Sequence, residues 1–127
     1  MTAEILIVED NPTNLKLATV VLAAAGYSIR GAADAEEAAD AIARKVPDLI
    51  LMDLGLPGKD GYEFTRELRS RAETGTVPIL AVTSFAMKGD RVKAMEAGCS
   101  AYVTKPIDRR ALLDVVDALL HPKWGGR

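Results

Sequence analysis

Polar side chains of three chemical kinds stand directly after the apolar runs of this sequence: carboxylates, hydroxyls and one ammonium group. They are Glu9 and Asp10 after the first run, Asp53 after the third, Thr83 and Ser84 after the fourth, and Lys105 after the fifth. Crowded carboxylates repel one another unless a cation joins them. Mg²⁺ takes carboxylate oxygens, keeps several waters and leaves room for a phosphate oxygen. If the fold gathers these side chains, they predict a magnesium-dependent phosphoryl-transfer site.

Each of these residue types has its own role in such a site. A carboxylate can form a covalent acyl phosphate, so we expect Asp53 to be the nucleophile. The phosphoryl oxygens need positive charge and hydrogen-bond donors as charge redistributes during transfer. Lys105 can supply an ammonium group for this purpose, and Thr83 can supply a hydroxyl.

The elements that must position these residues follow an alternating pattern. Short apolar runs alternate with longer amphipathic stretches, and the runs cover residues 5–8, 27–31, 49–52, 77–82 and 101–103. Most of them lack polar alternation, as expected for parallel strands that are buried on both faces. The run 27–31 does alternate, which predicts an edge strand. Pro78 cannot donate a main-chain hydrogen bond, so it should lie near the start of the fourth strand or at a gap in its pairing.

Helix signals fill the stretches between the runs. Asn11 followed by Pro12 predicts a capped helix that closes at Gly26, and Asp34 with Glu37 resembles a capping box for the second helix. The sequence also predicts a third helix over 61–71, a fourth helix that ends at Gly98, and a fifth helix that begins after Asp108 and ends at His121-Pro122. Strands and helices in this order predict βαβ units with right-handed crossovers around a parallel sheet.

Two small open sheets fit this pattern, the flavodoxin-like order 2-1-3-4-5 and the Rossmann-like order 3-2-1-4-5. The periodicity does not choose between them. In both, ligands bind outside the carboxyl ends of the strands, where the winding reverses. In the first order, Asp10 and Asp53 would follow neighbouring strands that lie roughly 4.8 Å apart.

Composition limits the function classes. The 127 residues fit one domain, which we place at 1–121 with a short C-terminal tail at 122–127. A formal net charge of −2 argues against nucleic acid as a partner. The single cysteine indicates a reducing compartment, the cytoplasm. The longest uncharged stretch, 74–87, is shorter than the roughly 20 apolar residues of a membrane-spanning helix, so we expect no membrane association.

These motifs together resemble the response-regulator receiver family, over residues 4–120. The strings that carry the resemblance are ILIVEDN at 5–11, PDLILMD at 47–53 with Pro57 and Gly61 after it, VT at 82–83 and YVTKP at 102–106. The resemblance implies an α/β fold of the flavodoxin-like (βα)5 type. Its doubly wound, five-stranded parallel sheet has the order 2-1-3-4-5, with helices on both faces.

The resemblance also implies a role for each residue at the strand ends. Asp53 becomes the phosphoacceptor. The implied Mg²⁺ ligands are Asp10, Asp53 and the main-chain carbonyl of Gly55, with Glu9 acting mainly through bound water. The implied phosphate-binding and switch residues are Thr83, Ser84, Tyr102 and Lys105, and the Lys105–Pro106 peptide bond is expected to be cis.

Receivers of this family take their phosphoryl group from a histidine kinase or a histidine phosphotransfer protein. The resemblance therefore implies a signalling phosphoacceptor that catalyses only its own phosphorylation and slow dephosphorylation. Phosphorylation would switch the surface of helix four, strand five and helix five, either to control a protein partner or to relay the phosphate. The string 85–90 is similar to those of phosphorelay receivers and single-domain cell-cycle regulators.

Two other function classes fit the residues less well. A phosphohydrolase with an aspartyl-phosphate intermediate commonly has a second acid two residues after the nucleophile, and here that position is Gly55. A nucleotide or flavin binder needs a glycine-rich turn after the first strand, and here residues 9–12 supply two carboxylates instead.

Overall fold

The computed structural model describes residues 2–56, 58–84 and 89–121. The motif residue Pro57, most of the string 85–90 and the tail at 122–127 lie outside the described residues.

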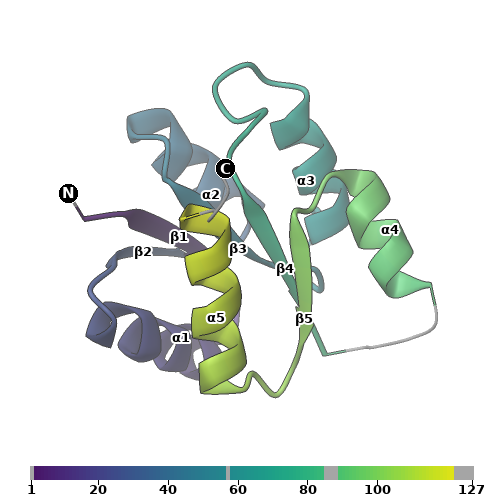
Figure 1. Cartoon of the computed structure of the whole chain (residues 1–127). Coiled ribbons are helices and arrows are strands. Elements are labelled where there is room, and N and C mark those ends of the chain that lie inside the picture. Colours follow the sequence, from purple (N-terminus) through teal and green to yellow (C-terminus); the bar gives the residue numbers. More distant parts are fainter. Residues whose placement is uncertain (1, 57, 85–88, 122–127) are drawn as a thin grey trace.

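The sheet has five parallel strands in the order β2-β1-β3-β4-β5 (Figure 1). The strands are β1 (Glu4–Val8), β2 (Ser28–Ala32), β3 (Leu49–Asp53), β4 (Ile79–Thr83) and β5 (Ala101–Thr104). This order confirms the flavodoxin-like arrangement and rules out the Rossmann-like alternative. The expected edge strand is β2, and Pro78 lies just before β4, where its carbonyl accepts a hydrogen bond from the Ile50 N–H at 2.9 Å.

Most of the helices begin at the expected side-chain caps. They are α1 (Pro12–Ala24), α2 (Ala35–Arg44), α3 (Gly61–Arg69), α4 (Asp90–Ala97) and α5 (Arg109–Leu120). The carboxylate of Asp34 accepts from the Glu37 N–H at 2.9 Å, while the Glu37 carboxylate accepts from Ala33, one residue earlier than in a standard capping box. Two side-chain carboxylates therefore stabilise the first turn of α2 through hydrogen bonds from main-chain N–H groups.

Helix α3 ends at Arg69, two residues before the expected boundary at 71. Side chains hold the chain in place beyond this end, through bonds to a carbonyl of the last turn of α3, to the loop before β4 and to the C-cap of α4. The Thr74 hydroxyl donates to the Leu68 carbonyl at 2.5 Å. The Arg69 guanidinium donates to the carbonyl of Val77 at 2.7 Å and to that of Gly98 at 2.8 Å.

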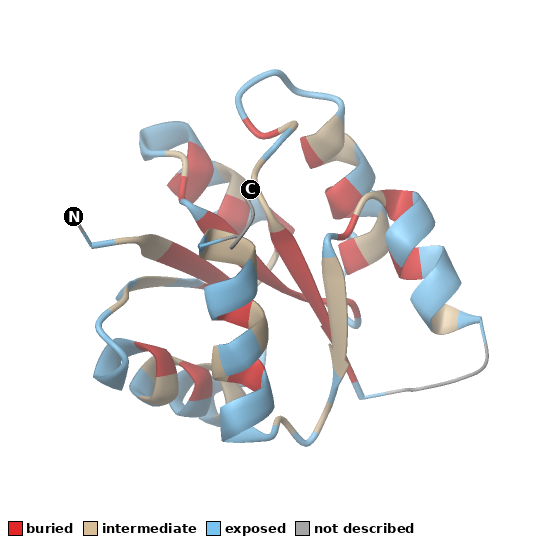
Figure 2. Cartoon of the chain, in the orientation of Figure 1, coloured by how far each residue is buried: buried red, intermediate tan, exposed pale blue. Residues whose placement is uncertain are grey.

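Helices cover both faces of the sheet (Figure 1). Helices α1 and α5 pack on one face, and α2, α3 and α4 pack on the other. The central strands β1, β3 and β4 are buried almost throughout, whereas the edge strands β2 and β5 are mostly half-buried or exposed (Figure 2). In the described part of the chain, no helix has the length and apolar character needed to span a membrane.

Candidate phosphoryl-transfer site

The strand register brings the polar strand ends into one row. Val8 pairs with Met52, so Glu9, the residue directly after β1, lies level with Asp53. Asp53 pairs in turn with Val82, directly before Thr83. Because the carboxyl ends of parallel strands share one edge of the sheet, these side chains meet although they are far apart in sequence.

Alternation along the strands decides which face each side chain takes. Ile7 and Leu51 pack under α1 and α5, so Glu9 and Asp53, two residues further on, project toward the same face. Ala81 and Tyr102 belong to the opposite core. The row of polar residues is thus divided between the two faces at the edge of the sheet.

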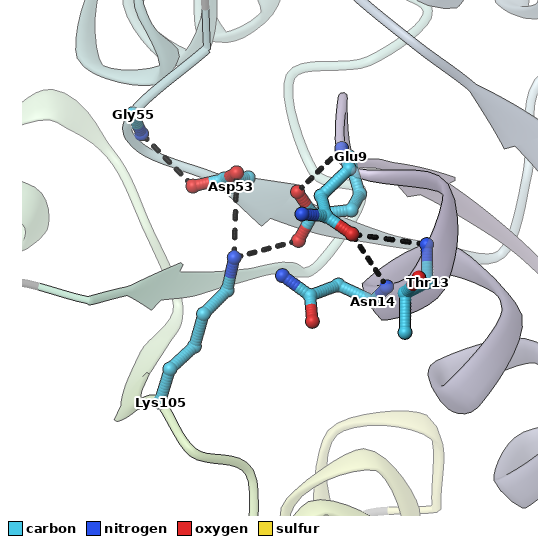
Figure 3. A network of polar contacts seen from close by, with 7 residues as sticks. Glu9, Thr13, Asn14, Asp53, Gly55 and Lys105 are labelled. Carbon is cyan, nitrogen blue, oxygen red and sulfur yellow. Dashed lines mark hydrogen bonds and ion pairs between the residues drawn. The ribbon is translucent and has the colours of Figure 1, made fainter.

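Three carboxylates and one ammonium group meet at this edge (Figure 3). Carboxylate oxygens of Glu9, Asp10 and Asp53 all lie within 4.8 Å of one another. The Lys105 ammonium lies 2.7 Å from Glu9 Oε1 and 3.5 Å from Asp53 Oδ2. Glu9 and Asp53 are each only 7% exposed, whereas Asp10 is exposed.

The charges of this cluster are not balanced. Burial raises the pKa of the Glu9 carboxyl, and the neighbouring Asp53 raises it further, while the hydrogen bond from Lys105 opposes both. For Lys105, burial by itself would lower the pKa, but the hydrogen bond to Glu9 and the charge of Asp53 outweigh it and raise the pKa. Three carboxylates meet one ammonium group in this cluster, so added positive charge is favoured.

The main chain around Asp53 holds its carboxylate in position. Asp53 Oδ1 accepts a hydrogen bond from the Gly55 N–H at 2.9 Å. The Leu54 N–H donates to the Val82 carbonyl at 2.9 Å, which extends the β3–β4 ladder past the site. Gly61, the first residue of α3, lies so close that a Cβ there would be 2.6 Å from the Asp53 carbonyl oxygen. The expected motif residue Gly61 is therefore needed for space beside the site.

A family model described as the response regulator receiver domain matches residues 5–117 of this chain. The chain belongs to the response-regulator receiver family. It is 40% identical over 120 residues to the polar-differentiation response regulator DivK of Brucella ovis, and the match covers 94% of this chain and 98% of that relative.

Solved receiver structures agree with this membership. The receiver domain of a sensor histidine kinase from Pseudomonas aeruginosa is 38% identical with a TM-score of 0.86, covers 94% of this chain and 98% of its own, and holds a coordinated magnesium ion in its active site cleft. The chemotaxis protein CheY4 of Vibrio cholerae is 26% identical with a TM-score of 0.89, covering 94% and 100% of the two chains. This chain is thus a receiver domain, a phosphoacceptor of two-component signalling.

The donor set of this receiver fits Mg²⁺. All three acidic side chains offer oxygen, which is the ligand atom that Mg²⁺ prefers. Three carboxylates beside one ammonium group also leave the cluster short of positive charge.

The structure also locates the expected phosphate-binding and switch residues. Thr83 is 5% exposed, and its carbonyl accepts a hydrogen bond from the Lys105 N–H at 2.7 Å. Ser84 is exposed. Tyr102 is half-buried, and burial raises the pKa of its hydroxyl. The Lys105–Pro106 peptide bond is cis, as expected.

One residue at the site was missed from the sequence. Asn14 lies in the first turn of α1, and its side chain is directed toward Lys105 and Glu9 (Figure 3). Asn11, recognised as the helix cap, accepts hydrogen bonds from the Thr13 N–H at 2.9 Å and from the Asn14 N–H at 3.1 Å. No local signal marked Asn14, because α1 carries apolar residues on several sides and its helical period does not single out the face that reaches the site.

Proposed function

We propose that Asp53 is the phosphoacceptor of this receiver. The observation that carries the proposal is the position of its carboxylate, which is 7% exposed, 3.5 Å from the Lys105 ammonium and within 4.8 Å of two further carboxylates. An incoming phosphoryl group at Asp53 would meet one ammonium group directly. It would also lie beside the acidic cluster that suits a divalent cation.

The proposed donor is a phosphorylated histidine of a histidine kinase or of a histidine phosphotransfer protein. A carboxylate oxygen of Asp53 attacks phosphorus, and a P–O bond forms as the P–N bond of the phosphohistidine breaks. The imidazole nitrogen leaves with the electron pair of that bond and takes up a proton. The product is an acyl phosphate on Asp53, which water later hydrolyses slowly. Catalysis is thus limited to the domain's own phosphorylation and dephosphorylation.

We assign the Mg²⁺ ligands to Asp10, Asp53 and the main-chain carbonyl of Gly55, with Glu9 acting mainly through bound water. When bound, Mg²⁺ offsets the negative charge of the phosphoryl oxygens. Lys105 would pair with the phosphoryl group. Its two contacts, with Glu9 at 2.7 Å and Asp53 at 3.5 Å, support this assignment because they hold the ammonium beside the acceptor.

The proposed response spreads through Thr83, Ser84 and Tyr102 to the surface formed by α4, β5 and α5. Two large apolar side chains of α4 support this surface as a site for a protein partner, because Val92 is 60% exposed and Met95 is 42% exposed. The signal passes to a protein, and neither nucleic acid nor a membrane takes part. We place the domain in the cytoplasm.

The test is intact-protein mass spectrometry after incubation with Mg²⁺ and acetyl phosphate. The expected result is a gain of one phosphate in the unmodified protein that disappears with EDTA and in Asp53→Asn. Asp40→Asn, at an exposed position of α2, is the matched control and should be phosphorylated normally. Labelling that persists in Asp53→Asn would refute the assignment.

Lys105 is tested separately. Lys105→Ala should still bind Mg²⁺, since the three carboxylates remain, but its phosphorylation-dependent response should weaken. Partner-free NMR spectra of the α4–β5–α5 surface before and after phosphorylation would measure that response, and an undiminished change would remove Lys105 from the mechanism.

A further inference from the structure

The core-facing stripe of α1 ends in a polar residue beside the phosphoryl-transfer site. Ala18 and Leu22 pack into the core and are 6% and 0% exposed. Asn14 stands four residues before Ala18, so it continues the same face of the helix toward its N-terminus. Glu9 and Lys105 meet under this end of α1, and Figure 3 shows the Asn14 side chain directed toward them. An amide therefore lies against the site's buried ion pair.

The main-chain N–H of Asn14 is hydrogen-bonded, whereas its side-chain amide is available as a donor. Its N–H donates to Asn11 Oδ1 at 3.1 Å, which anchors the first turn of α1. Asn14 lines a cavity of about 10 Å³ together with Glu9 and Asp53, and also a groove of about 230 Å³ beside Lys105. Within residues 2–56, 58–84 and 89–121, no hydrogen bond involves the Asn14 side-chain amide. This amide can thus serve a charged neighbour that loses its partner.

Phosphorylation would create such a neighbour. Lys105 donates to Glu9 at 2.7 Å, and Glu9 is 7% exposed. A phosphoryl group on Asp53 carries more negative charge than a carboxylate, so it attracts the ammonium of Lys105 away from Glu9. Glu9 would then keep the longer hydrogen bond from the Asn11 N–H, at 3.2 Å, but lose the short one from a charged donor, which destabilises a buried carboxylate. The transfer is therefore easier if a further donor can reach Glu9.

We propose that Asn14 is a positioning residue for phosphoryl transfer, whose amide donates to Glu9 when Lys105 moves to the phosphoryl group on Asp53. This inference rests on the proposed function of Asp53. An amide suits the role because it is neutral: it stabilises Glu9 without adding a charge that would compete with Lys105 for the phosphoryl oxygens. An aspartate at the same position would add another carboxylate to a cluster that already has an excess of negative charge.

The experiment measures the rate of phosphorylation by acetyl phosphate at saturating Mg²⁺ in Asn14→Leu, which keeps the approximate volume and removes the donors. The expected result is a rate lower by about tenfold, the size of one hydrogen bond to a charged group. The Mg²⁺ affinity measured by calorimetry and the midpoint of thermal unfolding should not fall, because an apolar residue continues the buried stripe. Lys16→Leu, at an exposed position of the same helix, is the control and should keep the full rate.

A double-mutant cycle separates positioning from a general structural effect. In Glu9→Gln there is no buried charge that needs a second donor, so adding Asn14→Leu should change the rate by less than about twofold. A normal rate in Asn14→Leu would overturn the inference, and so would an equal loss in both backgrounds. If the unmodified protein is phosphorylated and Asp53→Asn is not, either of these two results overturns the role of Asn14 and leaves the proposed function intact. Labelling of Asp53→Asn would overturn the proposed function and this inference together.

Discussion

Gly61→Ala tests how tightly the first residue of α3 packs against the site. A Cβ at this position would lie 2.6 Å from the Asp53 carbonyl oxygen and 2.7 Å from the Leu54 Cα. Ordinary contact begins at 3.4 Å, so one backbone segment must move by about 0.8 Å. Neither atom belongs to a side chain that could rotate away. The strain falls on the segment that carries the acceptor.

The expected loss of stability is the difference between two effects. Overpacking of this kind costs about 1–3 kcal/mol. Replacement of glycine by alanine also restricts the unfolded chain, which stabilises the folded state by about 0.4–1 kcal/mol. The free energy of unfolding should therefore fall by about 1–2 kcal/mol, as measured by urea denaturation in EDTA. Phosphorylation by acetyl phosphate should slow by about tenfold, because a displacement approaching 1 Å misplaces the Asp53 carboxylate.

Gly55→Ala is the matched control for stability. It makes the same substitution in the loop between β3 and α3, but its Cβ would meet only Asp53 Oδ1, at an ordinary 3.6 Å. Its unfolding midpoint should be unchanged or slightly raised. If Gly61→Ala is as stable as Gly55→Ala, the close approach at Gly61 does not constrain the site and the reasoning is wrong.

Three further perturbations test other parts of the structure. In magnesium-free buffer the free energy of unfolding should fall as pH rises from 4.5 through the higher folded pKa of Glu9. Burial keeps the Glu9 proton bound in the folded protein after the unfolded chain has released it. Urea titrations across this pH range should show the decrease, and Glu9→Gln should remove it. Asn11→Ala removes both hydrogen bonds that cap α1 and should lower the free energy of unfolding by about 1 kcal/mol, so an unchanged urea midpoint would contradict a stabilising cap. Arg69→Met leaves four main-chain carbonyls without their guanidinium donor and should cost about 3 kcal/mol by thermal denaturation; a loss below about 1 kcal/mol would show that water replaces the guanidinium.

The local elements of this receiver could be predicted because their signals lie within a few residues of one another. Uninterrupted apolar runs marked the buried strands, and the alternating run at 27–31 marked the edge strand β2. Short-range hydrogen bonds made the helix starts readable, as with Asn11 at the start of α1. The end of α3 was misplaced by two residues, and the chain beyond it is held by hydrogen bonds from Arg69 to Val77 and Gly98, which no local pattern contains.

Helix α1 shows a different limit of sequence reasoning. Its residues are apolar on several sides, so the helical period alone did not identify the buried face. In the structure Ala18 and Leu22 are buried, while Leu17 and Val20 are 61% and 58% exposed. Only the position of α1 over the sheet decides which stripe faces the core and which residue, Asn14, reaches the site.

The sequence by itself determined the chemical groups of the site, since Glu9, Asp53 and Lys105 each follow a strand that could be recognised from its apolar run. Their contacts were decided by the tertiary structure. Glu9 and Lys105 are 96 residues apart, and their 2.7 Å ion pair exists because parallel pairing in the order 2-1-3-4-5 aligns the ends of β1, β3, β4 and β5. The physical reason is that a hydrophobic period reports which face of an element is buried, whereas the partner of each strand depends on pairing across the whole sheet.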